Sequence, residues 1–334
     1  MGLKILKPGL LTTIQDTGRY GFQKDGVIVS GAMDRVALRL ANLLTGNQED
    51  EAALEITLKG PEIFFQEDQL ISITGADLSP TIDNKKLKLW RPIFVKKGSV
   101  LKFGTPKLGC RTYLAVCGGF QLQKALGSYS TYLRAGIGGM HGKALQEGDN
   151  IPCKGINVTA SSVLDELNLK QTADNFVQAS WAPDPAYLPS YEKDPVIRAV
   201  KGPEYELFTA TSKSNIWNNI FQVTQQSDRM GYSLAGLALA LEEAKELVSS
   251  AVTFGTVQVP PQGQPIILMA DHQTTGGYPR IAQVITADLP KLAQVVPGRG
   301  IRFTEVSIDE AQQLYLEQEH QLLQLKQSIQ IKVK

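Results

Sequence analysis

The stretch GTVQVPPQGQPIILMADHQTTGGYPR, residues 255–280, indicates how this chain folds. It contains most of a long run without charged residues, 248–270. The Pro, Gly and Gln residues in the middle of that run are too dense for a membrane helix. The apolar segments 252–259 and 265–270 instead have the length and the β-branched content of strands. The stretch therefore predicts two strands joined by a turn, followed by a polar loop.

Segments of the same kind recur along the chain. Each is rich in Val, Ile, Thr or aromatic residues and is bounded by Gly, Pro, Asp or Asn. Besides the two above, they are 71–78, 91–103, 111–120, 195–200 and 281–287. Short strands separated by turns favour barrels or sandwiches over alternating βαβ units. The predicted fold class is mainly β with a few α-helices.

Two segments have the periodicity of amphipathic helices. In 34–47 the apolar residues fall on one face and Asp34 can cap the start. Near the C-terminus, Ser307 and Glu310 form an S-x-x-E capping box. The tail 329–333 alternates apolar and polar residues, which predicts a final strand after that helix.

The composition of the chain changes at 179–195, which holds four prolines and several aromatic residues. Such a segment is typical of an extended connector. We therefore predict a boundary near residue 190, with an N-terminal domain 1–190 and a C-terminal domain 191–334. The segment 233–248 fits both a helix and a strand, and its state stays open.

The overall composition narrows the functional classes. Lys and Arg total 34 and Asp and Glu total 33, so the net charge of +1 gives no excess of cations for nucleic acid. The three cysteines show no C-x-x-C spacing, which argues against a disulfide framework or a zinc knuckle. The N-terminus has no apolar core of a signal peptide. We expect a cytoplasmic protein that binds neither nucleic acid nor membranes.

Familiar cofactor motifs fail on inspection. GGMHGKA (138–144) looks like a phosphate loop, but Ile137 stands where the first glycine belongs and Ala144 replaces the Ser or Thr that holds magnesium. GIGGMH places His141 at the third glycine of a dinucleotide-binding motif. The chain has three histidines and no H-E-x-x-H. We therefore predict no metal site and no recognisable cofactor site.

Four polar clusters in glycine-rich loops remain as candidate sites: 13–22, 30–35, 225–232 and 270–279. The last one follows an apolar strand, and two adjacent glycines would let a ligand approach the backbone closely. The alternative is structural, since turns are naturally rich in Gly, Asp and Thr. On that view Asp16–Arg19 and Asp228–Arg229 are surface ion pairs and Asp34 only caps its helix.

Within these clusters we assign roles by chemistry. His272 is the expected proton carrier, because the ordinary pKa of a histidine lies near neutral pH. The predicted catalytic residues are Asp271, His272, Asp228 and Arg229. The predicted substrate-binding residues are Gln15, Asp16, Arg19, Asp34, Gln273, Thr274, Thr275, Gly276, Gly277 and Tyr278.

Longer motifs show a resemblance to a known family. They are TTIQDTGRYGF (12–22), SGAMDRVALRLANLLTGN (30–47), AALEITLKGP (52–61), GCRTYLAVCGGF (109–120), GSYSTY (127–132), SDRMGYSLAG (227–236), the 255–279 stretch quoted above and PGRGIRF (297–303). This set resembles the family of bacterial 5-oxoprolinase C subunits (KipA), allophanate hydrolase subunit 2 and biotin-dependent carboxyltransferase domains. The resemblance runs from residue 12 to 303, nearly the whole chain, so the two predicted domains could form one continuous family domain.

The resemblance implies a fold of tandem cyclophilin-like β-barrels. It also implies two partners, a KipI-like B subunit together with a LamB/YcsF-like A subunit. The reaction implied is the ATP-dependent opening of 5-oxo-L-proline to L-glutamate, with ATP and Mg²⁺ used by the assembled complex. Ser233 stands where the family leads us to expect an arginine, so Arg19 or Arg229 would have to bind a substrate carboxylate.

Two other functions stay open at this point. One is a carboxyltransferase component that acts on carboxybiotin and a urea-like amide. The chain has no A-M-K-M biotin-attachment sequence, so biotin would arrive on a partner. The other is a regulatory role, in which a KipA-type protein antagonises a kinase inhibitor during sporulation control.

Overall fold

The computed structural model describes residues 2–155, 163–164, 167 and 174–333. The chain divides into two compact units. Unit 1 comprises 1–19, 34–189 and 321–334, and unit 2 comprises 20–33 and 190–320. Segment 20–33 thus belongs to a different unit from the residues on either side of it, which the sequence did not predict. Domains 1–190 and 191–334 stay a prediction.

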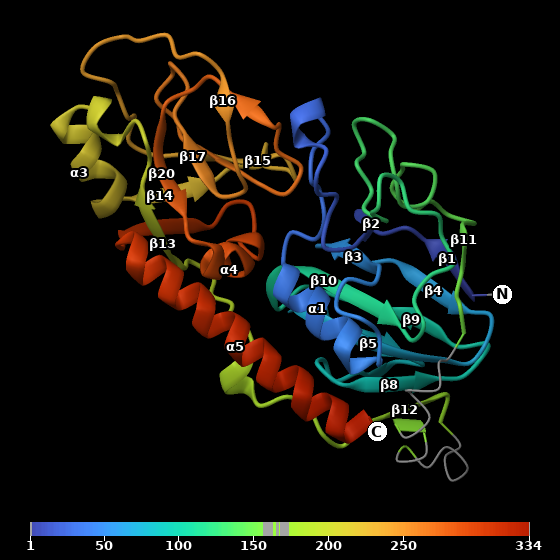
Figure 1. Ribbon diagram of the computed structural model, residues 1–334. Helices are drawn as coiled ribbons and strands as arrows, with labels where there is room; N and C mark the ends of the chain where they lie inside the picture. The colour runs from blue at the N-terminus through green and yellow to red at the C-terminus, as the bar shows by residue number, and fades with distance from the viewer. Residues whose placement is uncertain (1, 156–162, 165–166, 168–173, 334) are drawn as a thin grey trace. The chain divides into compact units, whose positions relative to one another are not determined.

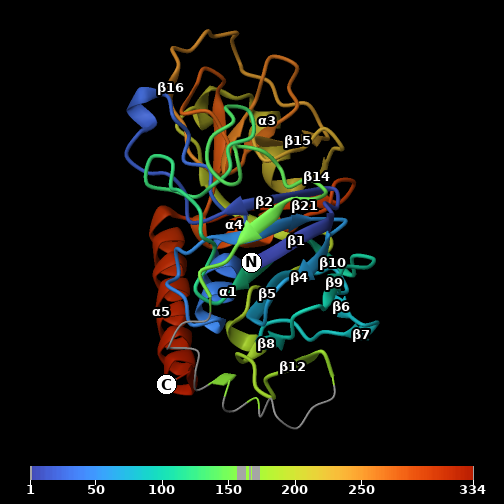
Figure 2. The ribbon, with the colours of Figure 1, turned by 90° about the vertical axis from the view of Figure 1, so that its right-hand side faces the viewer.

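Unit 1 contains two six-stranded antiparallel sheets. In order across the first sheet, the strands are β11 (Asn150–Pro152), β1 (Gly2–Lys7), β4 (Glu62–Phe65), β9 (Val100–Lys102), β6 (Thr81–Ile82) and β7 (Lys85–Lys86). Figure 2 shows β1, β4, β9 and β6 of this sheet side by side. The second sheet consists of β12 (Phe176–Gln178), β8 (Pro92–Val95), β5 (Gln69–Asp77), β10 (Leu108–Val116), β3 (Ala53–Thr57) and β2 (Leu11–Gln15).

Helix α1 (Arg35–Leu44) lies across β5 and β10 in unit 1 (Figure 1). Its apolar face is buried as the periodicity predicts. Two strand hydroxyls fasten it to the sheet: Ser72 donates to the main-chain oxygen of Ala41 at 2.6 Å and Thr74 to that of Ala37 at 2.7 Å. Because β5 is covered on this face, the polar side chains it carries are buried and hydrogen-bonded rather than solvated.

The start of α1 is held by a buried chain of hydrogen bonds. As predicted, Asp34 caps the helix, and its Oδ1 accepts from the amide of Ala37 at 2.9 Å. The amide of Asp34 donates to the phenol of Tyr113 at 2.8 Å, and that phenol donates to Glu55 Oε2 at 2.7 Å. Burial, together with the neighbouring charges of Glu55 and Asp34, raises the pKa of Tyr113 well above its ordinary value. The phenol therefore stays protonated and can donate at any physiological pH.

Unit 2 is built on a closed seven-stranded barrel. Around the barrel the strands are β13 (Val196–Lys201), β20 (Arg280–Val284), β17 (Thr256–Gln258), β18 (Ile266–Leu268), β15 (Gly231–Ala235), β14 (Ile220–Val223) and β21 (Gly300–Glu305). The pair β13–β21 is parallel and closes the barrel, and the other pairs are antiparallel. A two-stranded ribbon, β16 (Ser250–Ala251) with β19 (Thr275–Gly276), completes the unit's strands.

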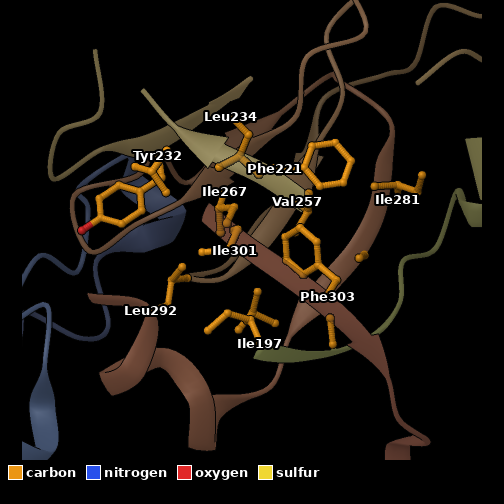
Figure 3. Packing of buried hydrophobic residues seen from close by; sticks show 14 of the residues in the cluster. Ile197, Phe221, Tyr232, Leu234, Val257, Ile267, Ile281, Leu292, Ile301 and Phe303 are labelled. Atoms are coloured by element: carbon orange, nitrogen blue, oxygen red, sulfur yellow. The ribbon is translucent and has the colours of Figure 1, made fainter. Parts of the chain in front are cut away.

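Alternating side chains from these strands fill the barrel (Figure 3). In β14 and β21, for example, Phe221 and Phe303 point inward with ring centroids 6.1 Å apart. Met33, from segment 20–33, also belongs to this buried cluster and is fully buried. Burial of a methionine side chain contributes roughly 1.5–3 kcal/mol, so this contact helps hold the segment in unit 2.

The other helices whose bounds are described include α3 (Ala210–Asn218), α4 (Leu289–Ala293) and the long α5 (Ile308–Val333), with 3₁₀ turns η1 (Gln23–Asp25), η4 (Pro185–Tyr187), η5 (Tyr205–Leu207) and η6 (Thr286–Asp288). Ser307 Oγ accepts from the amide of Glu310 at 3.1 Å, which confirms the predicted cap. The prediction of a strand at 329–333 is wrong, since α5 continues to Val333. Its buried residues Leu322, Leu325 and Ile329 recur at helical spacing, which overrides the short alternation.

The predicted mainly β class is confirmed, with the strands of unit 2 closed into a barrel and those of unit 1 arranged in two sheets. The predicted strands at 71–78, 111–120, 195–200 and 281–287 correspond to β5, β10, β13 and β20. Segment 91–103 divides into β8 and β9. The ambiguous segment 233–248 begins in β15 and then leaves regular structure.

The hydrogen-bond chain at the start of α1 makes a testable prediction. Tyr113→Phe removes the phenol that joins Asp34 to Glu55, and the loss of a buried partner costs about 1–3 kcal/mol. We expect the free energy of unfolding in urea to fall by that amount. Tyr315→Phe, at a ring that is 42% exposed, is the matched control and should change it by less than about 0.5 kcal/mol. Equal stability of the two variants would contradict this role.

Candidate functional site

The polar loop at the end of β18 is organised by a buried ion pair. Arg229 and Asp271 form a two-pronged contact, with Nε to Oδ2 at 2.9 Å and Nη2 to Oδ1 at 2.9 Å. Both side chains are only 5% exposed. The amide of Asp271 also donates to the main-chain oxygen of Arg229 at 2.8 Å. The pair thus fixes the loop after β18 against the loop before β15.

Segment 20–33 is attached to the same pair. Ser30 Oγ donates to Asp271 Oδ1 at 2.6 Å, and Arg229 Nη2 donates to the main-chain oxygen of Gly31 at 2.6 Å. Ser30 is fully buried and has a φ of 58°, in the left-handed region where a residue with a Cβ is uncommon. Such a conformation persists only where its surroundings enforce it. The hydrogen bonds from Ser30 to Asp271 and from Arg229 to the Gly31 oxygen hold this conformation.

These contacts decide between the two interpretations of Asp228 and Arg229. The interpretation as a surface ion pair is wrong for Arg229, since it is buried and pairs with Asp271. Asp228 is exposed, and its Oδ1 accepts from the amides of Met230 at 2.7 Å and Gly231 at 3.2 Å. That pattern shapes the turn into β15. A catalytic role for either residue stays a prediction.

His272 lies next to this pair and is 8% exposed. Its Nδ1 is 2.6 Å from the main-chain oxygen of Gln273. A carbonyl oxygen only accepts, so Nδ1 carries the hydrogen, and in the neutral ring Nε2 is the basic nitrogen. The histidine therefore has a defined orientation and tautomer, as a proton carrier requires.

The rest of the predicted loop forms the ribbon of unit 2. Gln273 and Thr274 are half-buried, while Thr275 and Tyr278 are exposed. Thr275 and Gly276 form β19, and Thr274 accepts through its main-chain oxygen from Val252 at 3.1 Å.

The two glycines of this loop approach other parts of the protein. A Cβ on Gly276 would lie 2.5 Å from Gln258 Nε2, and one on Gly277 would lie 3.3 Å from Ser249 Oγ. The side chains of Gln258 and Ser249 thus lie so close to these two positions that they leave little room for a Cβ. Contact of these glycines with a ligand stays a prediction.

Unit 1 holds a second buried polar centre around Asp16. One carboxylate oxygen accepts from the amide of Gly18 at 2.8 Å and from the hydroxyls of Ser128 at 2.7 Å and Ser130 at 2.5 Å. The other accepts from the amide of Tyr129 at 2.6 Å. Asp16 thus occupies the position that an anion would take inside the loop 128–130.

Arg19 and Gln15 extend this centre. Arg19 is fully buried and donates to the main-chain oxygens of Ala125 at 3.1 Å and Ser130 at 2.7 Å. The alternative of an Asp16–Arg19 surface ion pair is wrong, because both side chains are buried. Gln15 Nε2 donates to Thr13 Oγ1 and to the main-chain oxygen of Thr131, each at 3.1 Å. Within the described part of the chain its Oε1 is buried without a hydrogen-bond partner.

The structure therefore separates the predicted residues into two groups. Unit 2 brings together Asp228, Arg229, Asp271, His272, Gln273, Thr274, Thr275, Gly276, Gly277 and Tyr278, and unit 1 holds Gln15, Asp16, Arg19 and Asp34. Arg19 and Arg229, the cations expected to bind a substrate carboxylate, both already donate to groups of the protein. Substrate contacts by either group stay predictions.

Sequence reasoning did not select three serines that organise these centres. Ser30 lies in the cluster 30–35, and Ser128 and Ser130 lie in the motif GSYSTY. The three serines therefore stood inside motifs that the sequence had already singled out. Nothing in a single sequence shows, however, that Ser30 and Asp271 meet across 241 residues.

Two negative findings concern the described residues. They contain no group of three or more His, Cys, Asp or Glu side chains placed to hold a metal ion. None of their helices is both long enough and apolar enough to cross a membrane.

Comparison with known proteins places the chain in a family. A family model described as carboxyltransferase domain, subdomain A and B, matches residues 25–305. The 5-oxoprolinase C subunit of Haemophilus influenzae is 42% identical over 317 residues, which cover 95% of this chain and 95% of that protein. The C subunit of Escherichia coli is 40% identical over 322 residues, covering 95% and 97%. The chain belongs to the family of 5-oxoprolinase C subunits.

Membership of the family of 5-oxoprolinase C subunits confirms the resemblance that the motifs indicate. The fold is shared more widely. The crystal structure of the Kluyveromyces lactis urea carboxylase matches 96% of this chain with a TM-score of 0.85 and 29% identity. This chain spans 29% of that protein.

The ion pair in unit 2 predicts a large effect of a small substitution. Asp271→Asn leaves Arg229 buried beside a neutral amide, and breaking a buried pair costs about 3–5 kcal/mol. We expect that loss in the free energy of unfolding. Asp228→Asn is the control, because Asp228 is exposed and an asparagine oxygen can still accept from Met230, so the loss should stay under about 1 kcal/mol. A loss below about 1 kcal/mol at Asp271 would refute the structural importance of the pair.

Proposed function

We propose that this chain is a subunit of an ATP-dependent 5-oxoprolinase that opens 5-oxo-L-proline to L-glutamate. The observation that carries the proposal is the nearly end-to-end match with two bacterial 5-oxoprolinase C subunits, at 42% and 40% identity. Coverage of at least 95% on both sides means that the similarity is to these whole proteins and not to a shared segment.

The proposed reaction explains the need for ATP. The lactam of 5-oxoproline is a resonance-stabilised amide, so its carbonyl carbon is a poor electrophile. Transfer of the terminal phosphoryl group of ATP to the lactam oxygen makes that carbon electrophilic. Water then adds to the carbon, and the ring C–N bond breaks to give the amino group and an acyl phosphate. A second water hydrolyses this acyl phosphate to the side-chain carboxylate of glutamate and free phosphate.

The name of the relatives as subunits supports an assembly with other chains. The proposed partners are a KipI-like B subunit together with a LamB/YcsF-like A subunit. The assembled complex binds ATP with Mg²⁺. We assign no residue of this chain to the nucleotide.

In this proposal the residues of unit 2 have distinct tasks. His272 carries the proton, since its Nδ1 is committed to the Gln273 oxygen and Nε2 is the basic nitrogen. Asp271 is given no proton to carry, because its Oδ2 already accepts from Arg229 and its Oδ1 accepts from Arg229 and Ser30. Its task is to position the loop 271–278. Thr274 and Thr275 supply hydrogen bonds to the substrate.

Reconstitution tests the assignment of the reaction. The chain is purified alone and with both partner subunits, and glutamate release from 5-oxoproline is measured with ATP and Mg²⁺. We expect turnover only from the complete set. Glutamate release by the isolated chain, or no release by the set, would contradict the proposal.

The task of His272 is tested in the same complex. His272→Asn keeps an amide nitrogen near the position of Nδ1, which can still donate to the Gln273 oxygen, but it removes Nε2. Loss of a general acid–base group lowers turnover by about 10²-fold or more. His320→Asn, at an exposed histidine, should leave turnover unchanged. Full turnover by the His272 variant would remove this residue from the mechanism.

A second function has its own supporting observation. The urea carboxylase match covers 96% of this chain at a TM-score of 0.85, which favours a carboxyltransferase component that uses carboxybiotin carried by a partner. Avidin, which sequesters biotin, distinguishes the two. Under the 5-oxoprolinase proposal glutamate release is insensitive to avidin. An assembly that requires a biotin-bearing partner supports the alternative.

A further inference from the structure

Arg280 ends the stretch 255–280, and no step of the proposed chemistry uses it. It is the first residue of β20 and forms an ion pair with Glu204 of the same unit. Arg280 Nε lies 2.8 Å from Glu204 Oε2, and Nη2 lies 2.6 Å from Oε1. The amide of Arg280 also donates to Oε2 at 3.0 Å. The start of β20 is therefore tied to Glu204 through both the side chain and the backbone.

Glu204 is itself held against the barrel. It follows Gly202, whose amide donates to the main-chain oxygen of Ile281 at 2.9 Å. A Cβ on Gly202 would lie 2.1 Å from the main-chain oxygen of Arg280, so the absence of a side chain lets this turn approach β20. The Arg280 and Glu204 side chains are only 19% and 15% exposed. Hydrogen bonds from Arg280 lower the pKa of Glu204 below its ordinary value, so the carboxylate stays ionised at neutral pH.

The guanidinium of Arg280 has a third contact, which lies outside the barrel. Its Nη1 donates to the main-chain oxygen of Ala251 at 3.1 Å. Ala251 belongs to β16, where it pairs with Thr275 of β19. Figure 1 shows β16 at the edge of unit 2. Arg280 thus connects Glu204 on the barrel to the two-stranded ribbon.

The ribbon is too small to hold its position alone. It consists of two residue pairs, and a two-stranded ribbon is at best marginally stable by itself. The segment 242–249 that leads into it is mostly exposed, and the side chain of Val248 is 92% exposed. The place of the ribbon therefore depends on its contacts with the barrel. Arg280 supplies a contact in which the donor is charged, which is stronger than a hydrogen bond between neutral groups.

We propose that the Arg280–Glu204 pair is a positioning device that holds the β16–β19 ribbon where Thr274 and Thr275 meet the substrate. Neither charged residue touches the substrate. Thr275 is exposed in the ribbon, and Thr274 directly precedes it. Hydrogen bonds weaken steeply once their distance and angle leave a narrow range, so a small displacement of the ribbon removes them. The inference rests on the proposed function, because the task of the two threonines comes from there.

The shape of the arginine side chain suits this double contact. A guanidinium presents its N–H donors in a fixed planar fork, so Nε and Nη2 bind Glu204 while Nη1 binds Ala251. A lysine has a single nitrogen, which keeps the charge opposite Glu204 but cannot reproduce the three contacts together. Arg280→Lys therefore keeps an ion pair and loosens the ribbon.

Hydrogen exchange of the isolated full chain tests whether the pair holds the ribbon. The probe is the amide of Val252, which donates to the main-chain oxygen of Thr274 at 3.1 Å. Because a hydrogen bond to a charged group is lost, Arg280→Lys should speed this exchange about tenfold or more. Arg198→Lys is the matched control, since Arg198 binds Asp288 through its amide and guanidinium in the same way. Equal exchange at Val252 in the two variants would overturn the proposal.

Kinetics of the reconstituted complex test the consequence for the substrate. Arg280→Lys should raise the KM for 5-oxoproline about tenfold and leave kcat nearly unchanged, because contacts with the bound substrate are lost. A purely structural defect would lower kcat through loss of folded enzyme and leave KM unchanged. In a background of Thr274→Val and Thr275→Val, Arg280→Lys should raise KM no further. A KM like that of Arg198→Lys, or a further tenfold rise in the double background, would contradict a role through the threonines.

The two tests separate this inference from the proposed function. A complete wild-type set that releases no glutamate refutes the proposed function and with it the task of the threonines. The exchange test uses neither substrate nor partners, so it still decides whether the pair holds the ribbon. A wild-type set that releases glutamate, together with an Arg280→Lys variant that matches Arg198→Lys in both tests, refutes the positioning role alone.

Discussion

The buried contact between Arg229 and Asp271 is the interaction on which unit 2 most depends. Two charges removed from water are tolerated only when their hydrogen bonds are satisfied, and here Ser30 and the Gly31 oxygen complete the set. The pair joins three segments that are far apart in the sequence: 20–33, the turn into β15 and the loop after β18. His272 owes its defined position to this arrangement.

Unit 1 also has a buried aspartate that holds a loop in place, but the groups that donate to it are different. The Asp16 carboxylate has no lysine or arginine among its described hydrogen-bond partners but accepts from hydroxyls and amides of the loop 128–130. A buried carboxylate is costly unless it is fully hydrogen-bonded, so it specifies the conformation of the loop around it. In both units a buried aspartate shapes a glycine-rich loop. Family motifs that look catalytic in sequence therefore also have a folding task.

Much of the fold could be predicted from the sequence because its signals are local. The strand at 265–270 and the capped helix at 34–47 follow from side-chain periodicity and capping chemistry, and the structure confirms both. The tail 329–333 was predicted wrongly, because three alternating residues carry less information than the burial of Leu322, Leu325 and Ile329 on one helical face. The assignment of segment 20–33 to the barrel depends on Met33 and Ser30 meeting distant residues, which no local pattern encodes.

The candidate site shows the same limit. Polar residue types and paired glycines identified the loop 270–279, but the partner of each side chain was not predictable. Arg229 was paired with its neighbour Asp228 in one interpretation, whereas its partner is Asp271, which is 42 residues away. From a sequence alone, the simplest assumption is that a charged residue pairs with a neighbour in the chain. The partner of a buried charge is instead the residue that the folded structure brings next to it.

A double-mutant cycle between Ser30 and Asp271 tests the central claim most directly. The free energies of unfolding are measured for wild type, Ser30→Ala, Asp271→Asn and the double variant, so that the backbone strain at Ser30 cancels between the two arms. The account predicts a coupling energy of about 0.5–3 kcal/mol, as expected for side chains in direct contact within one network. Additivity within about 0.3 kcal/mol would contradict it, because independent sites add.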